Sequence, residues 1–461
     1  MMSLALLADV LKAPLIGRDA RFTGVSTDTR TLAPGDLFVA LAGPRFDGHS
    51  FLPEAIAKGA AGALLSRPLE TPLPHVRVPD TRRALGQLAA FWRRQFTLPV
   101  AAVTGSNGKT TVKEMVGSIL AETGPGCVTR GNLNNDIGVP LTLLRLRAAD
   151  RYAVIEMGMN HPGEIDYLSR LAAPTVAVIT NVAEAHLAGF DGVEGIARAK
   201  GEIFAGLAAD GVAVLNADDP FYELWRRLAA PRRCVTFGLE RPADFRADYR
   251  LDERGSALRM KTPAGEIDVR IALLGKHNVM NALAAAAVAL SAGAGLDQVA
   301  AGLAKLRAVA GRLEVKPGFS GARVIDDTYN ANPGSLAAGL EVLKSVPGER
   351  VLVLGDMAEL GEAGPDIHVH AGKLARDLGV HRLYALGELS ALAVASFGEG
   401  GRHFRTPAAL IDALVERMHA GMVVLVKGSR VMQMDRIVAG IVRRTEPEAP
   451  GAAAPARATD R

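Results

Sequence analysis

The chain has 461 residues, of which 49% are hydrophobic and 22% charged, and its formal net charge is +4. A chain of this length exceeds what one hydrophobic core usually supports, so we expect two to four domains. The basic residues form no block interleaved with aromatics, which make up only 5% of the chain, so composition gives no support for a nucleic-acid partner.

The sequence favours a cytoplasmic protein without membrane insertion. Residues 1–17 lack the basic leader of a secretion signal, and the most apolar stretch, 282–290, is too short to span a bilayer. Cys127 and Cys234 are far apart and show no CxxC spacing. A disulfide framework or a zinc site is therefore disfavoured, as is typical of a reducing compartment.

Three blocks of different pattern follow one another along the chain. Residues 1–97 mix short apolar runs with turn signals. In residues 98–313, strand-like runs alternate with helical patterns, with strands predicted at 98–103, 153–156, 176–180 and 212–216 and a long helix at 278–292. Residues 314–445 repeat the alternation, with strands predicted at 323–326, 351–355, 383–386 and 422–426. This pattern predicts a three-domain α/β fold with mostly parallel sheets, followed by a disordered tail at 446–461.

The strongest local signal is a glycine-containing loop between a predicted strand and a predicted helix. Its sequence is Thr104, Gly105, Ser106, Asn107, Gly108, Lys109, Thr110 and Thr111. The helix places Val112, Met115, Val116, Ile119 and Leu120 on one face. Glycines let main-chain N–H groups converge on phosphate oxygens, and a helix N-terminus adds partial positive charge. We therefore predict a site for ATP or a similar nucleotide, with Lys109 on the β- and γ-phosphates and the Thr110 hydroxyl on Mg²⁺.

The loop departs from the usual pattern Gly-x-x-x-x-Gly-Lys-Ser/Thr, because position 103 holds valine instead of glycine. The alternative is an accidental Gly-Lys-Thr at a strand–helix turn. The apolar strand before the loop and the amphipathic helix after it favour a phosphate loop.

The shortened loop resembles that of the Mur ligases and of their relatives the folylpolyglutamate synthetases, which form amide bonds through an acyl phosphate. Segments 131–140, 156–165 and 326–333 resemble the Mur ligase branch that adds D-alanyl-D-alanine, and the last is the most discriminating. The resemblance extends over roughly residues 20 to 440. It implies an N-terminal UDP-sugar-binding α/β domain (1–97), a central P-loop ATPase domain (98–313) and a C-terminal Rossmann-like ligase domain (314–445).

By this resemblance, several residues bind metal ions or act on the reacting groups. Glu156 is expected to bind Mg²⁺ together with Thr110, and His186 to bind a second Mg²⁺ near the γ-phosphate. Lys200 is expected to be carbamylated, because a carbamate supports a nearby cation that an ammonium would repel. Taken alone, Glu156 would be interpreted as a cap or surface residue, His186 as structural and Lys200 as a solvated helix lysine.

The resemblance also assigns nucleotide contacts outside the loop. Asn278 matches the residue that contacts adenine, although an N-cap of the long helix is an alternative that is compatible with it. Arg312 matches the arginine that reaches the γ-phosphate across the domain boundary, a task that suits a planar, always charged guanidinium. Asp327 matches the aspartate at the ribose.

The remaining assignments concern the other two substrates. The resemblance places Ser26, Thr29 and Arg30 at the uracil and diphosphate, and Thr129, Asn134 and Asn135 at the muramoyl group. Tyr329, Asn330 and Asn332 are expected to bind D-alanyl-D-alanine, and segment 427–430 to face a substrate. Met434 and Asp435 stand where the family has Met-Glu, a small departure outside the expected catalytic residues.

We therefore expect an ATP-dependent ligase, a monomer that closes on its ligands and joins D-alanyl-D-alanine to UDP-N-acetylmuramoyl tripeptide in cell-wall peptidoglycan synthesis. Segments 131–140 and 326–333 disfavour a sister ligase that adds one amino acid or glutamate. Two further alternatives are a binding or transport protein that merely hydrolyses ATP and a structural protein with a degenerate loop. Intact Lys109 and Thr110 disfavour the last. The sequence leaves open the third residue of the tripeptide and the base that deprotonates the amine.

Overall fold

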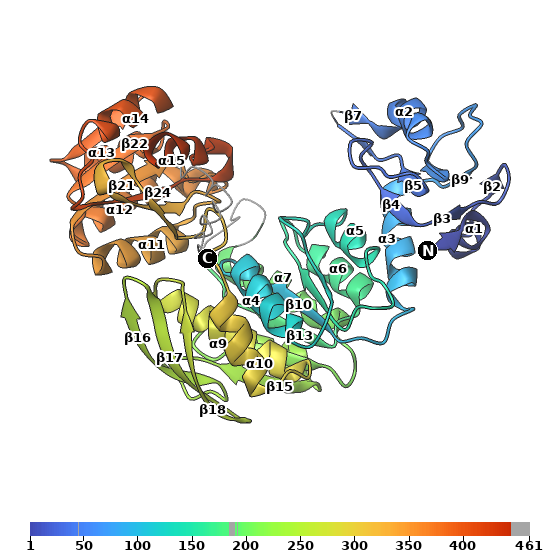
Figure 1. Ribbon diagram of the computed structural model, residues 1–461, viewed down its shortest axis with the longest axis horizontal. Coiled ribbons are helices and arrows are strands. Elements are labelled where there is room, and N and C mark those ends of the chain that lie inside the picture. The colour runs from blue at the N-terminus through green and yellow to red at the C-terminus, as the bar shows by residue number, and fades with distance from the viewer. Residues whose placement is uncertain (45, 184–189, 191, 444–461) are drawn as a thin grey trace, which may run out of the picture. The chain divides into compact units, whose positions relative to one another are not determined.

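The computed structural model describes residues 1–44, 46–183, 190 and 192–443, and Figure 1 shows its helices and strands. Residues 1–308 belong to one compact unit, and most of the chain from residue 309 onward belongs to a second. The predicted tail at 446–461 lies outside the described residues. In the part of the chain that is described, no helix is long and apolar enough to cross a membrane.

The first unit begins with a five-stranded sheet of order β2-β9-β8-β5-β4. Strands β4, β5, β8 and β9 are parallel, and β2 pairs antiparallel with β9 at one edge. The elements of this region are β1 (Met2–Ser3), α1 (Leu4–Leu11), β2 (Leu15–Ile16), β3 (Arg21–Phe22), β4 (Gly24–Ser26), β5 (Asp36–Val39), β6 (Ala42–Gly43), β7 (Phe46–Asp47), η1 (Gly48–Phe51), α2 (Leu52–Ala57), β8 (Gly62–Leu65), β9 (His75–Arg77) and α3 (Thr81–Arg93).

A six-stranded, wholly parallel sheet of order β11-β12-β10-β13-β14-β15 follows. Its strands are β10 (Val100–Thr104), β11 (Cys127–Val128), β12 (Ala153–Glu156), β13 (Val176–Ile179), β14 (Val212–Asn216) and β15 (Arg233–Phe237). All four strands predicted in this block are confirmed, with ends shifted by at most two residues. They are continuous apolar runs because both faces of the sheet are covered.

Alternate residues of this sheet enter two cores. Ala102 and Ile155 pack into one core, whereas Val103 and Val154 pack into the other. The first core contains residues of α3, α5 (Gly138–Leu143), α6 (Glu164–Ala172), α7 (Gly192–Gly201), η3 (Glu202–Gly206) and α8 (Tyr222–Ala229). The second contains residues of α4 (Lys109–Ala121), α9 (Lys276–Ser291) and α10 (Leu296–Lys305), which lie together in Figure 1. The predicted apolar face of the helix after the loop is confirmed, since its five residues are all buried.

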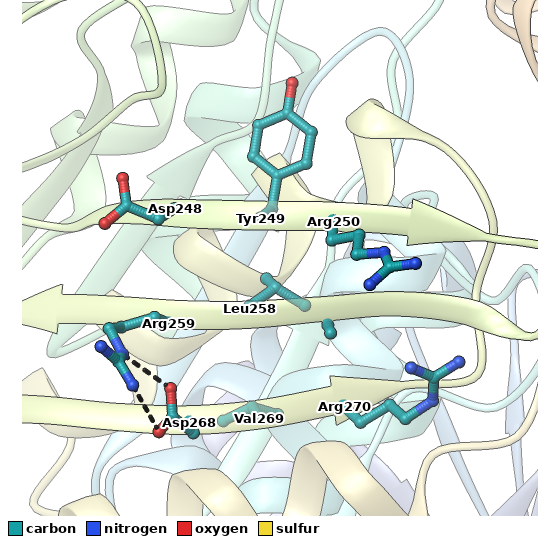
Figure 2. Close-up of a pocket in the computed structure, with 9 residues that line it drawn as sticks. Asp248, Tyr249, Arg250, Leu258, Arg259, Asp268, Val269 and Arg270 are labelled. Carbon is teal, nitrogen blue, oxygen red and sulfur yellow. Dashed lines mark hydrogen bonds and ion pairs between the residues drawn. The ribbon is translucent and has the colours of Figure 1, made fainter.

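None of the predicted elements corresponds to the antiparallel sheet of β16 (Arg246–Asp252), β17 (Gly255–Thr262) and β18 (Gly265–Ile271). Its apolar face buries Leu258 and Val269. Its other face carries charges that neutralise one another across strands, such as Arg259 and Asp268 at 3.0 Å (Figure 2). The alternation of charged and apolar residues is the signal for these strands. The central block therefore contains a separate antiparallel sheet in addition to the predicted parallel one.

The second unit contains a six-stranded sheet of order β19-β20-β24-β21-β22-β23, parallel except for β19. From residue 314 the elements are β19 (Glu314–Pro317), η4 (Phe319–Gly321), β20 (Arg323–Asp327), α11 (Pro333–Ser345), β21 (Glu349–Gly355), η5 (Gly361–Ala363), α12 (Gly364–Asp377), β22 (Arg382–Leu386), α13 (Ser390–Phe397), β23 (Gly401–Phe404), α14 (Pro407–Val415), β24 (Met422–Lys427), η6 (Arg430–Met432) and α15 (Asp435–Ile441). The four strands predicted here are confirmed. The α/β fold class holds for both units, and the boundaries at residues 97 and 313 stay predictions.

A close approach between α10 and α4 gives a stability test. A Cβ atom on Gly302 would lie 2.4 Å from Ile119 Cα, and the Gly302 carbonyl accepts a 2.6 Å bond from Ser118 Oγ. Gly302→Ala should lower the free energy of unfolding by about 1–3 kcal/mol, because main-chain atoms must move apart. Denaturant titration measures this. The control is Ala304, an exposed residue on the same helix. Ala304→Gln should lower the free energy of unfolding by less than about 0.5 kcal/mol. Equal losses in the two variants would contradict the close approach.

Candidate active site

The central strands bring the predicted phosphate loop and Glu156 to one edge of the sheet. Val103 pairs with Glu156 across β10 and β12, and Thr104 pairs with Ile179 across β10 and β13. All three strands run in the same direction, so their carboxyl ends meet at this edge, where open α/β sheets place their ligands. The glycine loop follows β10 there, and Thr180 follows β13.

Two positions of the loop require glycine. Gly105 has φ +151°, and a Cβ atom on it would lie 1.8 Å from Thr180 Oγ1. Gly108 has φ +81°, and a Cβ atom there would lie 2.5 Å from Asn281 Oδ1. Only glycine combines positive φ with such close neighbours. Val103 is a buried strand residue, so the missing glycine of the usual pattern reflects a loop that begins two residues later.

The loop is fixed to the segment that follows β13. Thr180 Oγ1 donates to Asn107 O at 2.6 Å, and Asn181 Nδ2 donates to the same carbonyl at 3.1 Å. Asn107 N in turn donates to Asn181 Oδ1 at 3.0 Å. Ser106 adds a bond from its main-chain N–H to Asn181 O at 2.9 Å and one from its hydroxyl to Ala183 O at 3.2 Å. The main chain of Asn107 and the hydroxyl of Ser106 therefore help to shape the loop.

Helix α4 begins at the loop with positive groups directed to the sheet edge. Its N-cap, Gly108, provides no side-chain cap. Lys109 Nζ donates to Gly105 O at 2.7 Å and to Ser106 O at 3.2 Å, and Thr110 and Thr111 are buried in the first turn. An uncapped helix N-terminus beside a lysine is suited to binding phosphate.

Glu156 is a buried carboxylate held in a defined orientation. Its Oε1 accepts a 2.8 Å bond from Asn134 Nδ2, and its main-chain N–H donates to Thr129 Oγ1 at 3.0 Å. Among the described residues, its buried Oε2 has no hydrogen-bond partner. Because an unpaired buried carboxylate oxygen is costly, this atom suits a hard cation such as Mg²⁺.

The donor set around Glu156 fits Mg²⁺ better than softer metals. No group of three His, Cys, Asp or Glu side chains that could hold a metal is found within residues 1–44, 46–183 and 192–443. Mg²⁺ needs only one or two carboxylates when hydroxyl and phosphate oxygens complete its shell. Glu156 and Thr110 would then hold the ion. His186, the predicted ligand of a second ion, lies outside the described residues.

Lys200, in α7, is buried, with 3% of its surface exposed. Burial, and secondarily the Lys109 ammonium, lowers the pKa of Lys200 well below its ordinary value. Its amine is therefore readily neutral, the form that reacts with carbon dioxide. The interpretation as a solvated helix lysine is wrong.

Lys113 was not predicted and is fully buried. Its Nζ donates to Thr129 O at 2.9 Å and pairs with Glu114 Oε1 at 2.6 Å. It thereby connects α4 to Thr129, whose hydroxyl supports Glu156. No local signal reveals this role, because a lysine in an amphipathic helix is usually solvated.

Asn278 lies within the first turn of α9, whose N-cap is Gly275, so the N-cap alternative is wrong. Asn278 Nδ2 donates to Leu274 O at 2.8 Å, and Asn281 Nδ2 donates to Asn278 Oδ1 at 3.0 Å. Asn281 is the residue whose side chain packs against Gly108. Asn278 is thus connected to the phosphate loop through Asn281, which bonds to Asn278 and packs against Gly108.

The predicted muramoyl residues differ in what their side chains do. Asn134 and Thr129 contact Glu156 directly. The Asn135 Oδ1 atom accepts from Gly138 N at 2.8 Å and Ile137 N at 3.2 Å, which stabilises the start of α5. The muramoyl roles of all three residues stay predictions.

The predicted UDP residues lie at the end of β4 and in the turn that follows it. Ser26 Oγ donates to Asp28 O at 2.9 Å, and the buried Thr29 accepts a 2.7 Å main-chain bond from Lys58 Nζ. Arg30 is exposed and pairs with Asp28 at 2.6 Å, and its hydrogen bond to that carboxylate lowers the pKa of Asp28. Ser26 and Thr29 therefore support the turn, while Arg30 faces solvent.

The second unit gathers the other predicted residues at the ends of β20 and β24. The Arg312 guanidinium lies 4.2 Å from the centre of the Tyr329 ring, a cation–π contact. Asp327 Oδ2 accepts a 2.5 Å bond from Lys427 Nζ. Burial raises the pKa of Asp327, and the Lys427 ammonium opposes the rise. Asn330 is exposed and Asn332 half-buried.

Comparison with known proteins identifies similar sequences and structures over nearly the whole chain. Family models match at residues 21–93 (Mur ligase family, catalytic domain), 103–289 (Mur ligase middle domain) and 311–430 (Mur ligase, glutamate ligase domain). The UDP-N-acetylmuramoyl-tripeptide–D-alanyl-D-alanine ligase of Escherichia coli K12 is 46% identical over 440 residues, which cover 95% of this chain and 97% of that protein.

Two solved structures extend this similarity to the fold. MurF from Acinetobacter baumannii superposes with a TM-score of 0.89 at 38% identity, over 95% of this chain and 98% of that one. MurF ligase from Thermotoga maritima in complex with ADP gives a TM-score of 0.81 at 30% identity, over 91% and 97% of the two chains.

One glycine of the loop and one positive-φ glycine outside it allow a matched test of the loop. Gly108→Ala should weaken ADP binding by about tenfold or more, because the new methyl group strains the loop against Asn281. Gly131 also has positive φ, +53°, but a Cβ atom there meets nothing within 4 Å, so Gly131→Ala should bind ADP nearly normally. Isothermal titration calorimetry measures both. Equal affinities of the two variants would contradict the loop assignment.

Proposed function

The chain belongs to the Mur ligase family, and we propose that it uses ATP to join D-alanyl-D-alanine to a UDP-N-acetylmuramoyl tripeptide. The product is the UDP-N-acetylmuramoyl pentapeptide of peptidoglycan synthesis. The observation that carries this conclusion is the near full-length similarity to an E. coli ligase of that activity. The phosphate loop at the end of β10 agrees with ATP as the energy source.

The reaction must make an unreactive carboxylate open to attack. A carboxylate is anionic and has no good leaving group, so the terminal carboxylate of the tripeptide accepts the γ-phosphoryl group of ATP to form an acyl phosphate. The amine of D-alanyl-D-alanine then attacks the acyl carbon, and phosphate leaves from the tetrahedral intermediate. Phosphoryl transfer of this kind depends mainly on positioning and charge neutralisation.

Residues of the phosphate loop and α4 would provide the first part of this neutralisation. The main chain of Gly105 to Gly108 would face the phosphates. Lys109 places its ammonium over the loop, where it is available to the β- and γ-phosphates. Asn278, one hydrogen bond from the residue that packs on Gly108, is placed suitably for the adenine. In the second unit, Arg312 would bind the γ-phosphate and Asp327 the ribose.

Glu156 and Thr110 would hold Mg²⁺, which neutralises charge on the phosphates when bound. The oriented carboxylate with one unpaired buried oxygen supports this role. We further propose that Lys200 is carbamylated and that His186 serves a second Mg²⁺. The lowered pKa of Lys200 supports the carbamate, because only a neutral amine adds carbon dioxide.

The other substrate contacts complete the proposal. Ser26, Thr29 and Arg30 would bind the UDP group, while Thr129, Asn134 and Asn135 would bind the muramoyl part. Tyr329, Asn330 and Asn332 would bind D-alanyl-D-alanine. A cytoplasmic location, a monomeric state and closure on the substrates stay predictions.

Phosphate release tests the function. With ATP and Mg²⁺, release should require both the UDP-N-acetylmuramoyl tripeptide and D-alanyl-D-alanine, and the nucleotide peptide should gain the mass of the dipeptide less water. Removal of Mg²⁺ with a chelator should abolish release. Release without either substrate would indicate a plain ATPase, and release with a single amino acid instead of the dipeptide would indicate a sister ligase.

The carbamate is tested by ¹³C nuclear magnetic resonance in ¹³C-bicarbonate. The wild type should show a protein-bound carbamate resonance that weakens as pH falls, since protonation of the amine releases carbon dioxide. Lys200→Met should lack it, whereas Lys344→Met, which removes an exposed lysine, should keep it. A resonance that persists in Lys200→Met would rule out carbamylation at this residue.

A further inference from the structure

Lys427 is a buried lysine at the end of a strand, and it has two partners in one segment. It is the last residue of β24, and only 1% of its surface is exposed. Its Nζ donates to Asp327 Oδ2 at 2.5 Å and to the main-chain carbonyl of Asn330 at 3.0 Å. One ammonium therefore holds both the residue proposed to bind the ATP ribose and a residue proposed to bind the dipeptide.

The topology of the sheet creates this arrangement. Asp327 and Lys427 are direct partners across the parallel strands β20 and β24, so both side chains lie where the two strands end. The Asp327 carboxylate is largely buried, with 13% of its side chain exposed, and such a charge requires a partner. A lysine ammonium has three donors, so the ion pair leaves donors for the Asn330 carbonyl.

The main chain after β20 is held while the Asn330 side chain remains exposed. A second bond from the same loop acts nearby, because Ser429 Oγ lies 3.4 Å from Ala331 O. Ser429 is itself fixed by a 2.7 Å bond from Ala358 N. Segment 327–331 is thus bonded to residues 427–429 at several points. Among the described contacts between these segments, only the bond from Lys427 includes Asp327.

The neighbouring aspartate shows that a Lys–Asp pair need not have this role. Asp326 pairs with Lys316 at 2.6 Å, and 29% of that lysine side chain is exposed. Asp326 also accepts a 2.7 Å bond from the Thr328 hydroxyl. Lys316 bonds to Glu314 and Asp326 only, among the described residues, and has no bond to Asn330.

We propose that Lys427 is a positioning residue that couples the nucleotide site to the dipeptide site, by fixing Asp327 and Asn330 relative to each other. The inference rests on the proposed roles of those two residues. Loss of the ammonium frees both the ribose-binding carboxylate and the main chain that presents Asn330. It leaves the UDP-sugar contacts, which are in the first unit, unchanged.

The test measures KM for each of the three substrates in Lys427→Met. KM should rise about tenfold for both ATP and D-alanyl-D-alanine, as expected for loss of charge-assisted hydrogen bonds. KM for the UDP-N-acetylmuramoyl tripeptide should stay within about twofold. Lys316→Met is the matched control and should leave all three values within about twofold. A general folding defect would lower kcat per total protein without this selective pattern.

Two further variants remove the risk that an unpaired buried carboxylate unfolds Lys427→Met. Asp327→Asn keeps the bond from Lys427 to the Asn330 carbonyl, so KM should rise for ATP but not for the dipeptide. Asp327→Asn combined with Lys427→Met removes both charges of the buried pair. This double variant should raise KM for both ATP and the dipeptide. A dipeptide KM equal to wild type in the double variant would overturn the inference. A wild type that releases phosphate without the dipeptide would instead overturn the proposed function on which the inference depends.

Discussion

The hydrogen bond from the Thr180 hydroxyl to the Asn107 carbonyl is the contact on which the nucleotide site depends. It fixes the phosphate loop to the strand beside its own, and the absence of a side chain on Gly105 lets the two segments approach. Lys109 follows this loop directly, and Asn281 of α9 packs against Gly108. A shift of the loop would therefore displace the proposed phosphate contacts and disturb the packing of α9 against the loop.

Three buried lysines show how one residue type acquires different chemistry from its partners. Lys113 donates to a carbonyl and pairs with Glu114, which gives it a structural role. Lys427 pairs with Asp327 and holds Asn330. Lys200 faces the like charge of Lys109, and burial lowers its pKa. Lys113 and Lys427 each have a carboxylate partner, whereas burial of Lys200 favours its neutral form. Among the three, Lys200 is therefore the one suited to reaction with carbon dioxide.

The asparagines near the nucleotide site also differ in the contacts that they make. Asn134 orients the Glu156 carboxylate, Asn135 stabilises the start of α5, and Asn281 packs against Gly108 while it donates to Asn278. An amide both donates and accepts, so it can join a loop to a helix without a net charge. Such neutral contacts leave the positive potential of the loop available for phosphate.

The sequence by itself determined the parallel strands and the loop, because both are local patterns. Buried parallel strands are continuous apolar runs, and a phosphate loop needs glycines and a lysine within a few residues. Strands β16 to β18 also carry a local signal, the alternation of charged and apolar residues, although the predicted elements do not include them. The tertiary structure decided which lysines are buried and which atom each polar side chain contacts. Asp327 and Lys427, for example, are separated by 100 positions and meet only because β20 and β24 are neighbours in the sheet, a pairing that no local pattern contains.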